Sequence, residues 1–139
     1  MITSGFAIVS LGAAQDAQTG SLSVFEIVDE FGSAGFPLLV QRAVFTVRLK
    51  RDPATDPPQV DCVMRLMLDD EELGHGEIRA DFRDKALANL MTRVDGVVIT
   101  RPGVVSFRLL HGEREVARCD VRAYMIAQPP RISAAAGTE

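Results

Sequence analysis

Alternation of apolar and polar residues is the dominant pattern of this chain, and it is clearest near the C-terminus. Between Gly103 and Ile126, apolar side chains occupy odd-numbered positions in two consecutive segments, with arginine, serine and aspartate between them. A period of two predicts β-strands with one apolar and one polar face. Because both arms are apolar at odd numbers, directly opposed residues have numbers with an even sum. The connection around Gly112 therefore needs an odd number of residues or a bulge, and glycine suits a left-handed position there.

The same period recurs along the rest of the chain. Strands are expected over residues 6–11, 22–28, 38–51, 60–68, 73–82 and 89–99, the second with a bulge that reconciles its two apolar phases and the last resuming after Asp95-Gly96. The connections carry turn chemistry: Gly12–Gly20 reads as flexible, Asp29–Pro37 as a glycine loop and Arg51–Gln59 as a proline-rich loop. Residues 83–88 favour one short helical turn.

These elements predict an all-β protein. The expected fold is a single antiparallel β-sandwich, immunoglobulin-like or jelly-roll-like, with seven or eight strands and at most one short helical turn. The inward positions would include Leu39 and Met125 beside the core residues Phe45, Met64, Leu66, Phe82 and Phe107. The sandwich domain would span residues 1–127, and 128–139 would form a flexible C-terminal tail, because prolines and small residues bury little surface.

Composition narrows the class of protein. At 139 residues and 47% hydrophobic, the chain fits one domain, and its net charge of -4 argues against nucleic-acid binding. No apolar stretch is long enough for a membrane span, and the apolar residues 6–14 lack the basic segment of a signal peptide. A cytoplasmic location is expected. Cys62 and Cys119 would then be buried free thiols, although their separation of 57 residues resembles that of an inter-sheet disulfide.

Two segments carry a resemblance to a known family. The runs SLSVFEIVDEFGSAGFPLLVQRAVFTVRL and NLMTRVDGVVITRPGVVSFRLLHGEREVARCDVRAYMI, with their Phe-Pro strand start and Pro-Gly turn, resemble a family of small bacterial β-sandwich proteins of unknown function. The resemblance covers about residues 5–126, and this chain departs from it by a longer, alanine-rich first connection. It implies the fold, and it implies no activity, cofactor or catalytic residue.

The residues themselves point away from catalysis. His75 and His111 are the two histidines, one expected on an outward strand face and one at a hairpin tip, and neither lies in a nucleophile motif. No enzyme activity, cofactor or metal is therefore predicted. The weak alternative is calcium bound by the acidic hairpin tip, because hard cations take several carboxylate oxygens; the residues are Asp69, Asp70, Glu71 and Glu72.

Outward-facing side chains suggest a contact surface instead. The last hairpin presents arginines and an aromatic residue beside apolar positions, namely Arg108, Arg118, Arg122, Tyr124, Leu110 and Val116. Basic residues of another strand, Arg42, Arg48, Lys50 and Arg51, would complete a basic face if the two strands were neighbours; the alternative is an ordinary solvated face. Outward Val40, Val44 and Ile126 also hint at a covered surface.

The functional prediction is a non-enzymatic protein that works through protein–protein contact. It would form a homo-oligomer or be one component of a bacterial or phage-related assembly, with no nucleic-acid or membrane partner. The alternative is a ligand-binding module for a sugar, a lipid or calcium. Its site would be built from the end loops of the sandwich, with Phe31 and Phe36 as contacts.

Overall fold

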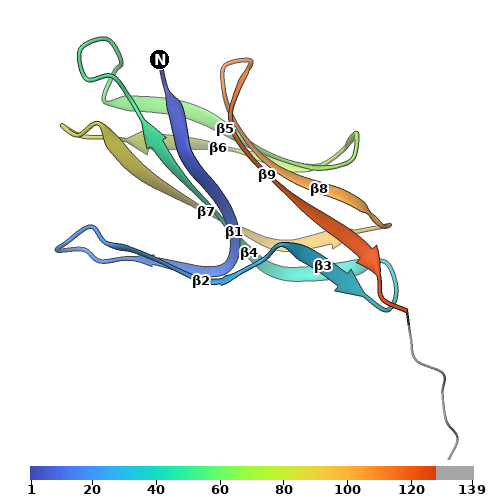
Figure 1. The fold of residues 1–139 in the computed structure, drawn as a ribbon. Helices are drawn as coiled ribbons and strands as arrows, with labels where there is room; N and C mark the ends of the chain where they lie inside the picture. Colours follow the sequence, from blue (N-terminus) through green and yellow to red (C-terminus); the bar gives the residue numbers. More distant parts are fainter. Residues whose placement is uncertain (128–139) are drawn as a thin grey trace, which may run out of the picture.

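The computed structural model describes residues 1–127, which form two β-sheets packed face to face (Figure 1). The strands are β1 (Thr3–Gln15), β2 (Leu22–Ile27), β3 (Glu30–Ser33), β4 (Leu38–Lys50), β5 (Gln59–Leu68), β6 (Glu71–Asp81), β7 (Leu87–Ile99), β8 (Gly103–His111) and β9 (Arg114–Met125). One sheet has the order β2-β1-β4-β7 and the other β3-β9-β8-β5-β6. The predicted all-β sandwich is confirmed, while the finer immunoglobulin-like or jelly-roll-like class stays a prediction. The predicted tail, 128–139, lies outside the described residues.

The strand count differs from the expected seven or eight, because residues 1–127 form nine strands; one of the pairs is parallel. The extra strand is β3, which lies in the predicted glycine loop and pairs parallel to β9. Gly32 allows this close approach: a Cβ there would lie 2.9 Å from Cδ1 of Ile126 and 3.0 Å from Oη of Tyr124. Four residues that include a glycine show no alternation, so the sequence pattern predicted a loop.

The first strand is also longer than expected. The segment Gly12–Gln15, predicted to be flexible, continues β1 and pairs with β2, whereas Thr3–Ser10 pairs with β4. The β1–β2 hairpin thus extends beyond the part of β1 that pairs with β4 and bends away from β4 (Figure 1). Its tip is tied by the Asp16 carboxylate, which accepts the backbone N–H groups of Gln18 and Thr19 at 2.8 and 2.9 Å.

The last hairpin has the predicted geometry. Phe107 lies opposite Cys119 with an even sum, the register shifts by a bulge after Leu109, and Gly112 adopts a φ of 63°. The bulge turns Val116 inward, and Val116 is buried. Its predicted outward position was therefore wrong. Met125, expected inward, is 52% exposed because it lies beyond the last residue pair between β8 and β9.

A kink crosses β4 and β7 at the same level. Gly96 has a φ of 71°, and beyond it the buried positions change from even to odd numbers, so that Val97 and Ile99 enter the core. On β4 the same change buries Val40 and exposes Leu39. The predicted inward Leu39 and outward Val40 were both wrong. The predicted break at Asp95-Gly96 is confirmed.

Aromatic packing joins the two sheets at the centre of the core. The rings of Phe45 on β4 and Phe107 on β8 lie 5.8 Å apart between centroids, and both side chains are buried. On one flank, β1 contacts β9 through the hydroxyl of Ser4, which donates to the carbonyl oxygen of Val116 at 2.9 Å. The core therefore leaves one face of each sheet pointing outward.

Candidate functional site

The outward side of the four-stranded sheet carries both apolar and basic side chains, and we call it the outer face. Strand register aligns its residues in rows across β1, β4 and β7, opposite the core positions, and one row extends to Ile27 on β2 through Ser10; Phe25 pairs with Gly12, beyond the part of β1 that pairs with β4. Two of them, Phe25 and Ile27, are 55% and 58% exposed. Sheets of a two-layer sandwich usually present polar residues to solvent. The apolar members of the outer face are Phe6, Ile8, Phe25, Ile27, Val44, Leu87 and Met91.

Thr46 forms the middle of the outer face. It lies opposite Ile8 on β1 and Met91 on β7, and it is completely buried although it points away from the core. Its hydroxyl oxygen has no hydrogen-bond partner among the described residues. A buried hydroxyl without a partner costs about 1–3 kcal/mol. The centre of the face, around Thr46, is therefore buried, and we call it the floor; partly exposed apolar side chains surround it.

Basic side chains lie at both ends of this floor. Arg48 stacks over the Phe6 ring at 5.2 Å and donates from Nε to Oδ1 of Asn89 at 3.1 Å. At the other end, Arg93 forms an exposed ion pair with Asp95 at 3.2 Å. The outer face can thus bind an apolar surface that also carries hydrogen-bond acceptors.

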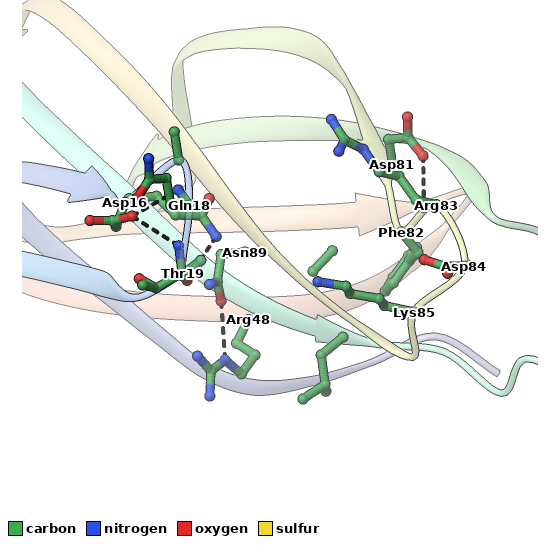
Figure 2. A pocket seen from close by; sticks show the side chains of 15 residues that line it. Asp16, Gln18, Thr19, Arg48, Asp81, Phe82, Arg83, Asp84, Lys85 and Asn89 are labelled. Carbon is green, nitrogen blue, oxygen red and sulfur yellow. Dashed lines mark hydrogen bonds between the residues drawn. The ribbon is translucent and has the colours of Figure 1, made fainter.

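A cleft of about 720 Å³ opens at the Arg48 end (Figure 2). The tip of the β1–β2 hairpin, the turn between β6 and β7, and the adjoining parts of β4 and β7 line it. Hydrogen bonds from Thr19 and Gln18 hold the pKa of Asp16 below its usual value, and Asp81 accepts the N–H of Arg83 at 2.9 Å. These two carboxylates stabilise their own turns, so the cleft has the chemistry of a contact site.

Phe31 lines a second cavity, of about 850 Å³, beside the start of β4. Leu11, Val28 and Leu38 contribute apolar walls, and Arg42 contributes a cation. Phe36, the other aromatic residue of the predicted ligand loop, does not line this cavity; it packs against the core. The structure thus places one of the two predicted ligand contacts at a cavity.

The predicted arginine patch of the last hairpin does come together, but acidic side chains balance it. Arg118 lies opposite Arg108 and contacts Asp120 at 2.8 Å, and both arginines face Glu115 at 3.8 and 3.6 Å. The Asp120 carboxylate is the main reason why the pKa of Arg118 is raised. Burial favours a higher pKa for Asp120, yet its hydrogen bonds with Arg118 and Ser106 bring the net shift below the usual value.

Other members of that patch have structural contacts. The guanidinium of Arg122 lies 5.5 Å from the centre of the Tyr124 ring, and Leu110 is half-buried. The second stripe, on β4, belongs to the other sheet, so the two stripes do not form one basic face. Arg51, expected in that stripe, is 6% exposed and points into a loop junction.

The acidic side chains of the predicted calcium tip, Asp69 to Glu72, contact different partners and do not converge. Asp69 accepts the N–H of Val104 at 3.0 Å, and Arg101 binds Glu71 at 2.8 Å. Glu72 turns to another surface and contacts Arg65 at 3.0 Å. Asp70 is exposed. Within residues 1–127, no three acidic, histidine or cysteine side chains are arranged to hold a metal ion.

The two cysteines are free thiols. Cys62 on β5 and Cys119 on β9 lie in the same sheet with β8 between them, a strand separation of about 9–10 Å. A disulfide requires Cα atoms closer than about 7 Å. Burial is the main reason why both thiols have a raised pKa. The immunoglobulin-type bridge is therefore excluded within one chain.

Comparison with family models gives a match over residues 7–123, to a family described as "Family of unknown function (DUF6941)". The chain belongs to this family. The family prediction is confirmed, while the bacterial origin stays a prediction. Comparison of this DUF6941 member with curated proteins finds no match. No helix of the length and apolarity needed to cross a membrane occurs in the described part of the chain.

Proposed function

We propose that this DUF6941 member is a non-enzymatic, cytoplasmic protein that acts through protein–protein contact, as a homo-oligomer or as a component of a bacterial or phage-related assembly. The observation that supports this proposal is the outer face of the four-stranded sheet. Large, exposed apolar patches on soluble proteins mark interaction sites, and burying such a surface drives association. Phe25 and Ile27, each more than half exposed, lie at its β2 edge and would be its most accessible apolar contacts.

Site-specific photo-crosslinking tests this proposal. A benzophenone amino acid at Phe25, in the native host, should give a discrete cross-linked protein band. The same group at Met125 is a matched control, because that side chain is 52% exposed and lies on the other sheet. Equal cross-linking at both positions, or none at Phe25 while the variant stays folded, would contradict a contact through the outer face.

A ligand-binding function is the second candidate, and the cavity beside Phe31 favours it. Its apolar walls and the nearby Arg42 and Arg93 suit a small amphipathic molecule with an acidic group, such as a fatty acid. Fluorescence titration with a fatty-acid probe would test this. Saturable binding that Phe31→Ala weakens at least tenfold would favour it, and unchanged binding in that variant would reject the cavity as the site.

A further inference from the structure

The charge on the outer face identifies the chemistry of its partner, an inference that rests on the proposed contact function. Four basic residues point outward from β4 and β7, and one carboxylate, Asp95, accompanies them; the basic residues are Arg42, Arg48, Lys50 and Arg93. Of the four, Arg93 pairs with Asp95. Among residues 1–127, no carboxylate lies within 4.0 Å of the charged group of Arg42, Arg48 or Lys50. The sheet face is therefore basic on a chain whose net charge is -4.

The five-stranded sheet shows that this imbalance is specific to one face. There, neighbouring arginines also lie opposite one another across three strands, as Arg65, Arg108 and Arg118. Each has an acidic partner: Glu72 binds Arg65 at 3.0 Å, and Glu115 faces the other two. On the outer face Arg93 is compensated in this way by Asp95, whereas Arg42, Arg48 and Lys50 have no such partner among residues 1–127, so these three cations are available to carboxylates of another molecule.

The order of residues along β4 gives the spacing that a partner must match. Outward positions read Arg42, Val44, Thr46, Arg48 and Lys50, so cations lie on both sides of an apolar centre. Arg42 and Arg48 are separated by six residues of strand, which corresponds to about 20 Å. A helix covers that distance in about 13 residues. Between Val44 and Lys50 the backbone of β4 is paired on both sides, by β1 and β7, so side-chain packing is the contact available to a partner there.

The same features argue against other occupants. A second copy that used this face on both chains would bring the cations of β4 against each other, because the interface of a two-fold dimer is self-complementary. Nucleic acid would place its regularly spaced phosphates over Val44 and Met91, which offer no donors. Separate carboxylates on an otherwise apolar segment fit both the cations and the floor.

We propose that the outer face binds an acidic, amphipathic segment of a different protein. Its apolar side chains pack over Ile8, Phe25 and Ile27, and its carboxylates bind Arg42 at one end of the floor and Arg48 at the other. Exposed charge pairs set specificity and association rate more than affinity, whereas the apolar centre supplies most of the binding free energy. This narrows the proposed function to a heterologous contact.

Synthetic helical peptides test the proposal with the full chain. The probe carries leucines on one side and two glutamate pairs about 14 residues apart, close to four full turns, so that both pairs return to the same side of the helix. Its matched versions carry lysine or glutamine in place of glutamate. Isothermal titration should show micromolar binding of the glutamate peptide, at least tenfold weaker binding of the other two, and weakening as salt rises. Arg42→Glu should weaken binding of the glutamate peptide at least tenfold and favour the lysine peptide. Arg79→Glu, on the other sheet, should leave the binding of both the glutamate and the lysine peptide unchanged.

Several outcomes would overturn this inference. Equal binding of all three peptides, or no binding of the glutamate peptide at 1 mM, would reject the acidic partner; the contact function would survive if Phe25 still cross-links to a protein. Equally tight binding of single-stranded DNA would show a general polyanion surface. A sedimentation dimer that Phe25→Ser dissociates would show that a second copy covers the face. Absence of both peptide binding and Phe25 cross-links would reject the contact function itself.

Discussion

Replacement of Arg51 by methionine should destabilise the fold more than any other loss of a charge on this chain. Arg51 follows β4 and is 6% exposed. Its guanidinium donates to three backbone carbonyls, those of Lys85 at 2.7 Å, Asp56 at 3.1 Å and Arg83 at 3.3 Å, and lies 5.7 Å from the centre of the Phe82 ring. One side chain thus joins the β4–β5 loop to the β6–β7 turn.

The magnitude follows from these three bonds. A hydrogen bond to a charged group contributes about 1.5–3 kcal/mol, but loop carbonyls regain water when the donor is lost. Methionine keeps the apolar stem, so the change isolates the guanidinium. We expect a loss of about 2–4 kcal/mol in the free energy of unfolding, since the longest of the three bonds contributes least. At roughly 3 °C per kcal/mol for a chain of this size, Tm should fall by about 6–12 °C.

Chemical denaturation by urea, followed by circular dichroism, measures this loss, and Arg79→Met is the matched control. The Arg79 guanidinium contacts Asp61 at 2.8 Å, but both side chains are more than 60% exposed, so its loss should cost less than about 1 kcal/mol. Arg51→Lys should be intermediate, because one ammonium group cannot reach all three carbonyls in the same geometry. A loss below about 0.5 kcal/mol for Arg51→Met, with an unchanged m value, would refute the reasoning.

Two further changes test other parts of the fold. A Cβ at Gly103 would lie 2.5 Å from Oδ2 of Asp69, so Gly103→Ala should lower the free energy of unfolding in urea by about 1–3 kcal/mol. Gly76→Ala is the control, because a Cβ there meets nothing within 4 Å, and it should be neutral or stabilising. Equal effects of the two changes would contradict this prediction. Because the pKa of Asp16 is lowered in the folded protein, the ionised carboxylate stabilises the hairpin fully above the usual pKa of 3.8, and this stabilisation is lost as pH falls through the lower folded value. NMR should therefore show the Asp16 carboxyl titrating below 3.8. The hairpin tip should lose hydrogen-exchange protection over the same pH range. Titration of Asp16 at or above 3.8 would contradict that assignment.

The sequence predicted most of the fold because period two is a direct consequence of sheet geometry. It worked best in the interior strand β5, where buried and more exposed residues alternate along the whole length. It failed where backbone conformation changes the phase, as at the kink beside Gly96, and where a short strand contains a glycine, as in β3. A left-handed residue shifts every later side chain to the other face, and alternation alone cannot show where that happens.

The outer face was missed for a related reason. In β2, even positions Leu22 and Val24 and odd positions Phe25 and Ile27 are all apolar, so both phases looked acceptable. The structure shows that the odd positions are the exposed ones, since Ile27 lies in a row with Ser10 and Val44 on the outward side. The sequence did contain a signal for this face, namely that β2 has apolar residues at both even and odd positions. A strand that is apolar on both sides has two surfaces to cover, and one core can cover only one of them.

The two basic stripes, on the last hairpin and on β4, look alike in the sequence but differ in their acidic neighbours. On the last hairpin, Arg118 is followed two residues later by Asp120, and the structure pairs them at 2.8 Å. On β4, the outward Arg42, Arg48 and Lys50 have no acidic residue within the strand. Surface ion pairs contribute little stability, but pairing within the chain removes the field that attracts a partner. The unpaired stripe beside an apolar floor therefore has the stronger basis for recognition, and the hairpin first favoured by the sequence has the weaker one.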